Sequence, residues 1–214
     1  MLITAHSGAH KTRRNSKKYF DDIAKYNVDA IEVDIYKFGK TLYLSHMPSF
    51  PSLRLPLTFA FDFIKQHNFK INCDVKQIGI VKDVLYLAQK HDVLDKIIFT
   101  GSVWPGDLKH LEHGEVYLNK SFFRLLSPRP RDVKTIARYI KTLNCQRISG
   151  INFKHTYLSD EFLAECKKHQ VNVSTFVVNS EKEMDRLLQH EIVVNITTDN
   201  ASKLLEKAKR IITR

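Results

Sequence analysis

The feature that most limits the possible folds of this 214-residue chain is the regular alternation of short apolar runs with longer amphipathic segments. The apolar runs are rich in Ile and Val, which is typical of strands in a buried sheet. The segments between them carry apolar residues at helical spacing. Strands that alternate with helices in this way predict βαβ units and a parallel sheet.

The expected elements give about eight βα units, which is the count and the minimum size of a (β/α)8 TIM barrel. The expected strands cover residues 2–5, 30–36, 41–45, 70–75, 96–100, 115–118, 148–153, 171–178 and 192–197. The expected helices cover residues 15–26, 57–66, 81–91, 131–143, 160–169, 181–189 and 201–212. Phe38-Gly39-Lys40 suits a tight turn between the second and third strands.

The alternative fold is a doubly wound open sheet. That fold normally has a glycine-rich phosphate turn after the first strand, and only Ser7-Gly8 stands there. No Pro/Gly/Ser-rich linker and no repeat divides the chain. We therefore expect residues 1–214 to form one α/β barrel domain.

Composition and charge leave several classes of partner open. No apolar run approaches the roughly 18–20 residues of a membrane span, and the N-terminus lacks a signal segment, so we expect a cytoplasmic protein. The formal charge of +11 is compatible with nucleic acid, an anionic membrane surface or an anionic substrate. The densest basic clusters are Lys11, Arg13, Arg14, Lys17 and Lys18, then Arg124, Arg129 and Arg131. We interpret them as solvated helix faces, with one basic rim around an anion site.

Three carboxylates stand near the ends of neighbouring expected strands. Glu32 and Asp34 lie two residues apart within an apolar strand, so both side chains point to one face. Asp74 lies near the end of the next barrel strand, with Lys76 on the same face. Buried carboxylates are unfavourable unless they are paired or bound to metal. The set predicts a hard-oxygen site for one divalent cation, Mg²⁺ or Ca²⁺. The alternatives are an exposed face of an edge strand and a local Asp74–Lys76 ion pair.

Two histidines follow expected strands at the same end. His6 follows the first strand and His46 closes the third. Imidazole titrates near neutral pH, so the pair could supply a general acid and a general base, and Lys76 adds a cation for an anionic substrate. A purely structural role is the alternative. The other histidines are His10, which lies close to His6, and His67, His91, His110, His113, His155, His169 and His190, which we expect at the surface.

The order of these residues resembles the glycerophosphodiester phosphodiesterase family over essentially the whole chain. The segments that carry the resemblance are Ala5-His6-Ser7-Gly8, Arg13-Arg14-Asn15-Ser16, Val28-Asp29-Ala30-Ile31-Glu32-Val33-Asp34-Ile35, Phe38-Gly39-Lys40-Thr41-Leu42-Tyr43-Leu44-Ser45-His46-Met47, Cys73-Asp74-Val75-Lys76, Phe176-Val177-Val178-Asn179 and Ile196-Thr197-Thr198-Asp199. The resemblance implies a (β/α)8 barrel with catalytic His6 and His46, metal ligands Glu32, Asp34 and Asp74, and substrate contacts from Lys76, Ser7 and Phe176.

Several positions depart from the family pattern. Ser7 replaces the arginine that helps to hold the phosphate, Met47 replaces an Asp, and Phe176 replaces a Trp. Arg14 stands in place of Glu, and Asp74 replaces Glu as the third ligand. Arg13, Arg14 or His10 could replace the lost arginine. The segment between the second histidine and the next strand is short, so the small insertion domain of many family members is expected to be absent.

The resemblance implies a metal-dependent phosphodiesterase that converts a glycerophosphodiester, or a related phosphodiester, to an alcohol and glycerol phosphate. No nucleic-acid partner is expected. Three alternatives remain: a sphingomyelinase D-like phospholipase, a catalytically weak barrel that binds an anionic ligand, and a barrel that binds polyanions or a membrane surface through its basic face.

Overall fold

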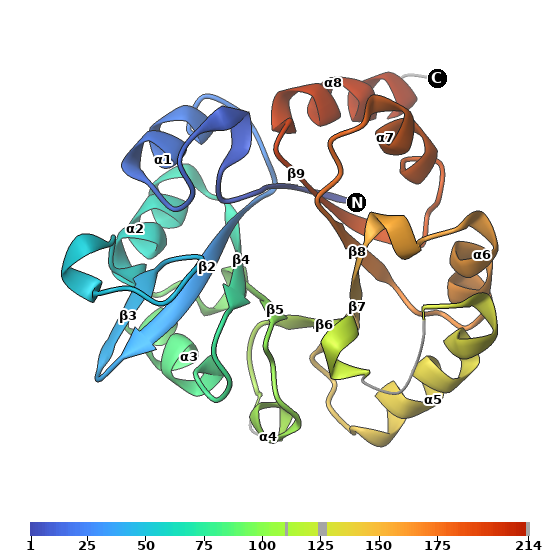
Figure 1. Ribbon diagram of the computed structural model, residues 1–214, viewed down its shortest axis with the longest axis horizontal. Coiled ribbons are helices and arrows are strands. Elements are labelled where there is room, and N and C mark those ends of the chain that lie inside the picture. The colour runs from blue at the N-terminus through green and yellow to red at the C-terminus, as the bar shows by residue number, and fades with distance from the viewer. Residues whose placement is uncertain (110, 124–127, 213–214) are drawn as a thin grey trace.

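Eight parallel strands close into a ring in the computed structural model, which describes residues 1–109, 111–123 and 128–212. The ring contains β1 (Leu2–Ala5), β2 (Ala30–Phe38), β4 (Lys70–Val75), β5 (Ile97–Gly101), β6 (Glu115–Asn119), β7 (Ile148–Lys154), β8 (Val173–Phe176) and β9 (Val193–Thr198). Strand β1 pairs in parallel with both β2 and β9, which closes the barrel. The helices lie outside the ring (Figure 1). The (β/α)8 barrel predicted from the sequence is confirmed, whereas His110 and Arg124 lie outside the described residues.

The helices follow the strands in the expected order. They are α1 (Lys17–Ile23), α2 (Leu57–His67), α3 (Val81–Lys90), α4 (Pro105–Leu108), α5 (Val133–Thr142), α6 (Asp160–Lys168), α7 (Glu181–Leu187) and α8 (Ala201–Ile212). The sequence did not predict α4, because a four-residue helix that includes Pro105 and Gly106 has no helical periodicity to detect. Helix α1 begins later than expected because Ser16, whose Oγ accepts a hydrogen bond from the Tyr19 amide, caps its N-terminus.

The ninth strand, β3 (Thr41–Leu44), is not part of the barrel. It pairs antiparallel with β2 after a turn in which Gly39 has a φ of 57°, so the predicted hairpin is present. His46 follows this third strand, as predicted, although β3 runs back along β2 and is not a barrel strand. His46 reaches the carboxyl end of the barrel because Leu44 pairs with Ile35, and the Ser45 amide bonds the Asp34 carbonyl. Segment 45–56, which connects β3 to α2, holds one short 3-10 turn and no inserted domain.

The two faces of the sheet differ in polarity. Side chains such as Ile31, Val33 and Ile35 alternate along β2 with its carboxylates and belong to the apolar core between sheet and helices. The face that lines the barrel is polar. Its side chains form a hydrogen-bonded chain across five adjacent strands through Thr4, Asn195, Ser174, Asn152 and Asn119. Barrels of this class are more often filled by branched apolar side chains.

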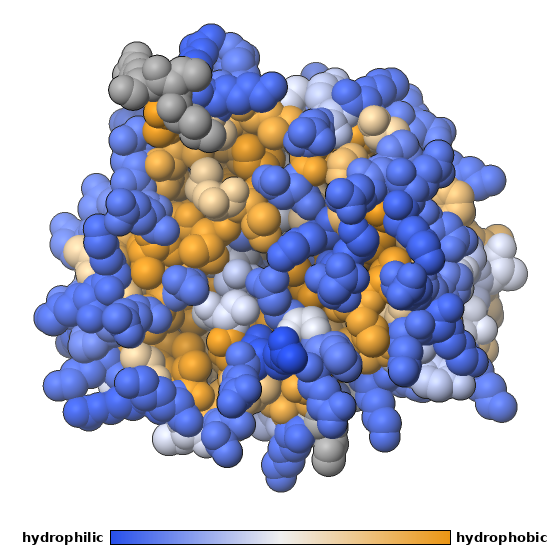
Figure 2. Space-filling model, turned by 180° about the vertical axis from the view of Figure 1, so that it is seen from behind, coloured by the Kyte–Doolittle hydropathy of each residue, from blue (hydrophilic) through white to orange (hydrophobic). Residues whose placement is uncertain are grey.

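The face seen from behind carries hydrophilic side chains around its periphery, with hydrophobic residues visible between them (Figure 2). In the part of the chain that the structure describes, no helix combines the length and the apolar character that a membrane span requires.

Candidate active site

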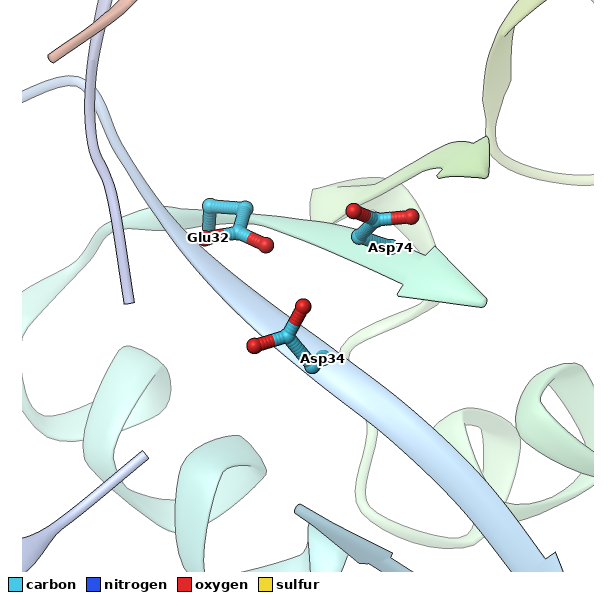
Figure 3. A group of neighbouring side chains, drawn as sticks. All are labelled: Glu32, Asp34 and Asp74. Atoms are coloured by element: carbon cyan, nitrogen blue, oxygen red, sulfur yellow. The ribbon is translucent and has the colours of Figure 1, made fainter. Parts of the chain in front are cut away.

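Three carboxylates meet at the carboxyl ends of β2 and β4. Glu32 and Asp34 come from β2, and Asp74 comes from β4, where it is the register partner of Asp34. One oxygen from each of the three lies within 4.8 Å of the others. Their carboxylates turn toward a common space (Figure 3). The placement follows from the period of two along a strand, which puts Glu32 and Asp34 on the same face.

Hydrogen bonds fix two of these carboxylates from the side of β1. The Ser7 amide donates to Glu32 Oε2 at 2.7 Å, and the Ser7 hydroxyl donates to Asp34 Oδ2 at 3.1 Å. Asn15 binds Asp34 twice: its Nδ2 donates to Asp34 Oδ2 at 2.8 Å, and its Oδ1 accepts from the Asp34 amide at 3.1 Å. Both carboxylates are thereby held in one orientation before any ligand binds.

Lys76 supplies the compensating charge. Its Nζ lies 2.5 Å from Asp74 Oδ2 and 2.8 Å from Asp34 Oδ1. Burial works to raise the pKa of Asp34, but the charge of Lys76 and bonds from Lys76, His46 and Asn15 hold it low, at about 2. Burial and the charge of Asp34 raise the pKa of Glu32 to about 7. Burial also raises the pKa of Asp74, against the influence of Lys76. The raised pKa values of Glu32 and Asp74 mean that Lys76 does not fully compensate the negative charge of the three carboxylates.

The cluster has the chemistry of a hard-cation site. Asp74 Oδ1 is buried and, among the described residues, has no hydrogen-bond partner. An unsatisfied buried carboxylate oxygen is costly, and a cation would satisfy it. Oxygen donors from three carboxylates are the set that Mg²⁺ and Ca²⁺ prefer. The residues present therefore fit a divalent cation.

The His6 ring contacts Asp199 through one nitrogen and approaches Glu32 with the other. Its Nδ1 is 2.7 Å from Asp199 Oδ1, and its Nε2 is 3.9 Å from Glu32 Oε2. Asp199 is itself fixed by Asn179, whose Nδ2 donates to Asp199 Oδ2 at 2.7 Å. Burial works to lower the pKa of His6, but the bond to Asp199 and the charges of Glu32 and Asp199 outweigh it. The pKa of His6 is raised, which favours the imidazolium near neutral pH.

His46 approaches the cluster from the hairpin. Its Nδ1 lies 3.0 Å from Asp34 Oδ1, and its side chain is 45% exposed, whereas that of His6 is 12% exposed. With Nδ1 held by a carboxylate, the Nε2 atom of His46 is the ring nitrogen left for other contacts. The two histidines therefore contact different carboxylates of the same cluster.

Two of the expected substrate contacts occupy other positions. Ser7 is fully buried, and its amide and hydroxyl donate to Glu32 and Asp34, so these contacts orient the two carboxylates. Phe176 ends β8 and is half-buried; no hydrogen bond or ring contact joins it to the cluster within the described ranges. His10, a suggested substitute for the missing arginine, is bound to Asp22 at 2.7 Å. Arg14 is exposed, and its charge acts on His6.

Sequence reasoning assigned no role to three residues of this site: Asn15, Asn179 and Asp199. Asn15 lies in the motif Arg13-Arg14-Asn15-Ser16, but nothing in that motif beyond the residue type indicates its φ of 53°. Asp199 ends the last motif of the resemblance, but its contact with His6 forms only because β9 pairs with β1 in the closed barrel.

Fold and site together define a (β/α)8 barrel with an acidic, histidine-flanked centre at the carboxyl ends of its strands, where enzymes of this fold carry their active sites. A protein from Agrobacterium tumefaciens assigned as a glycerophosphoryl diester phosphodiesterase superposes with a TM-score of 0.81 at 12% identity, over 100% of this chain and 99% of that one. An Oleispira antarctica phosphodiesterase, solved in complex with its product sn-glycerol-3-phosphate, gives 0.77 at 13% identity, over 98% and 97%.

A barrel of another class fits less closely. The N-(5'-phosphoribosyl)anthranilate isomerase of Pyrococcus furiosus gives a TM-score of 0.58 at 11% identity, over 98% of this chain and 99% of that one. No family model and no curated protein matches the sequence. At these identities the comparisons establish the fold, and the resemblance to glycerophosphodiester phosphodiesterases that the motifs indicated is confirmed at that level.

Proposed function

We propose that residues 1–214 form a single-domain, metal-dependent phosphodiesterase that hydrolyses glycerophosphodiesters to an alcohol and glycerol phosphate. The observation that carries this proposal is the pair of histidines on one carboxylate cluster, His6 beside Glu32 and His46 on Asp34. The fold shared with glycerophosphodiester phosphodiesterases supports the substrate class. The glycerol phosphate bound to the Oleispira relative supports the product.

Glu32, Asp34 and Asp74 would hold one divalent cation, Mg²⁺ or Ca²⁺. When bound, the cation supplies Lewis-acid stabilisation of the charge that develops on the phosphoryl oxygens. Ser7 and Asn15 keep Glu32 and Asp34 oriented toward it. These contacts matter because ligands fixed in advance lose little conformational freedom when a cation binds.

The two histidines divide the proton transfers. Water adds its hydroxyl to phosphorus, the bond from phosphorus to the alcohol oxygen breaks, and one proton must move to the departing alcohol. His6 carries that proton, because Asp199 and Glu32 favour its imidazolium. His46 removes the proton from the attacking oxygen, with Asp34 holding its Nδ1. Lys76 lies within the cluster and Arg14 at its edge, and both offset the negative charge of the diester.

The direct test is hydrolysis of glycerophosphocholine and of bis(p-nitrophenyl) phosphate with added Mg²⁺, Ca²⁺ or Mn²⁺. Activity should disappear with EDTA and return with the cation. His6→Ala and His46→Ala should each lower kcat by about 10²–10⁴-fold, as expected for general acid–base groups. His91→Ala serves as the matched control, because His91 pairs with Asp62 away from the site.

Activity that survives EDTA, or full turnover by either site variant, would exclude this mechanism. Cation and phosphate-ester binding without turnover of any diester would instead favour the weak, ligand-binding barrel. Binding of polyanions that is steeply salt-dependent and unaffected by Glu32→Gln would favour the basic-face alternative.

A further inference from the structure

An apolar cavity of about 560 Å³ lies beside the candidate active site. It is bounded by the loops that follow β4, β5 and β6 and by one face of α5. The four-residue α4 is the only helix between β5 and β6 among the described residues, so the outer layer of the barrel is thin at this position (Figure 1).

The wall of this cavity is aromatic. Trp104, Phe122, Phe123 and Tyr139 line it, and Tyr139 contacts both phenylalanines with ring centroids 5.9–6.1 Å apart. None of the described residues that line the cavity carries a charge. Trp104 is nevertheless 48% exposed. Exposed apolar surface gathered in a concave site is typical of ligand binding, and this volume lies within the usual range for such sites.

The cavity and the carboxylate cluster adjoin each other at the end of β5. Ser102, which lines the cavity, donates its amide hydrogen to the Val75 carbonyl at 2.7 Å, next to Asp74 on β4. The preceding residue, Gly101, lies directly against Asp74 Oδ1. A chain attached to a phosphate that is bound at the cation site would enter the aromatic cavity past Ser102.

We propose that this cavity receives the single fatty acyl or alkyl chain of a lysophospholipid-type phosphodiester. The inference rests on the proposed phosphodiesterase function and narrows its substrate class. The phosphate would bind at the cation that the three carboxylates hold, and the uncharged aromatic wall matches a hydrocarbon chain. A small glycerophosphodiester would leave the wall in contact with water and would gain no binding from it.

The first experiment uses a reporter that the chain already contains. Trp104 is the only tryptophan in the sequence and lines the cavity, so its fluorescence reports occupancy without catalysis. Dodecylphosphocholine, kept below its micellar concentration, should produce a saturable blue shift, and glycerophosphocholine should produce none. Affinity should rise roughly fourfold per added methylene from the octyl to the dodecyl compound, which is on the order of 10²-fold in total.

Thr135→Phe tests the location of binding. Thr135 is exposed on α5 and lines the cavity, so a phenyl group there fills the space without disturbing the core. Thr142→Phe is the matched control, because Thr142 ends the same helix and is not part of the lining. Thr135→Phe should weaken dodecylphosphocholine binding by at least tenfold, whereas Thr142→Phe should bind like the parent.

Measurements of hydrolysis distinguish this inference from the proposed function. With cation present, kcat/KM should increase with acyl length across lysophosphatidylcholines, and Thr135→Phe should remove that increase while glycerophosphocholine turnover stays unchanged. Hydrolysis of glycerophosphocholine with no effect of chain length, or equal dodecylphosphocholine binding by parent and Thr135→Phe, would overturn the inference alone. Chain-length-dependent binding at Trp104 without hydrolysis of any diester would retain the cavity and overturn the phosphodiesterase proposal.

Discussion

Gly101 packs so tightly against Asp74 that a Cβ atom at position 101 would lie 2.1 Å from Asp74 Oδ1. The same Cβ would lie 2.4 Å from the Val75 carbonyl oxygen. Gly101 also has a φ of 84°, a conformation that residues with side chains rarely adopt. The orientation of the third carboxylate therefore depends on the absence of a side chain on the neighbouring strand.

Gly101→Ala should displace Asp74 and weaken binding of Mg²⁺ or Ca²⁺ by at least tenfold, measured by isothermal titration calorimetry. Gly79→Ala is a close control, because Gly79 has a φ of 82° but no atom within 4 Å of the added Cβ. That variant carries only the conformational cost, about 1–2 kcal/mol in urea unfolding. Equal cation binding by the two variants would show that Asp74 is not a ligand.

Glu32 makes the stability of the metal-free protein depend on pH. Its pKa is raised from 4.5 to about 7, so the folded state keeps a proton that the unfolded chain releases. Stability in EDTA should therefore fall as pH rises from 4.5 to 7, by up to about 1.4 kcal/mol per pH unit. The raised pKa values of Asp74 and His6 act in the same direction. The lowered pKa of Asp34 affects the free energy of unfolding only below pH 3.8.

Cation affinity should show the opposite trend, because the ligand must lose its proton before it binds. Affinity should rise with pH up to about 7 and then level off, with protons released in calorimetry. Glu32→Gln should flatten the fall in stability between pH 5 and 7 in urea unfolding. An unchanged slope in that variant would assign the effect to other groups.

Asp199→Asn should lower the pKa of His6, because it removes the negative charge that stabilises the imidazolium. The basic limb of the kcat/KM profile should move to lower pH, and an NMR titration of the His6 ring should show the same shift without substrate. Asp185→Asn is the control, because Asp185 pairs with Lys207 at the surface. A profile identical to the parent would mean that Asp199 does not set the pKa of His6.

Asn15→Ala should reduce the free energy of unfolding by about 3 kcal/mol in urea denaturation. The substitution removes both hydrogen bonds to buried Asp34 and places alanine at a φ of 53°. Asn68→Ala isolates the backbone cost, because Asn68 has a φ of 57° and its side chain accepts a hydrogen bond from Lys96 Nζ, away from the site. If the two variants lose equal stability, the contacts to Asp34 contribute nothing.

Much of the fold could be predicted because local pattern and global topology agree. The apolar runs set the strands, and the period of two along residues 30–36 already placed Glu32 and Asp34 on one face. The hydrophobic pattern was misleading in short elements and at element boundaries. It did not detect α4, and it extended β8 beyond Val173–Phe176, although Gln170 has a φ of 56° and the Val171 amide still closes α6 by bonding Cys166.

The sequence predicted which residue types form the site, but it did not predict which side chains contact each other. A histidine after a first strand and a histidine after a hairpin read alike in sequence. The structure gives them different carboxylates, Asp199 and Glu32 for His6 and Asp34 for His46. Ser7 was identified by its position in a motif, but its burial gives it a different set of partners. Residue type limits the chemistry, and packing decides which atoms meet.

The sequence by itself determined the strand order, the common face of Glu32 and Asp34 and the acidic character of the centre, because these follow from spacing along one chain. Only the tertiary structure decided that Asp199 meets His6 from 193 positions away, since that contact exists only when β9 closes against β1. The tertiary structure also determines the pKa of Glu32. Its pKa is set by burial and by the charges of Asp34 and Asp74, which depend on distances across neighbouring strands and on exclusion of water.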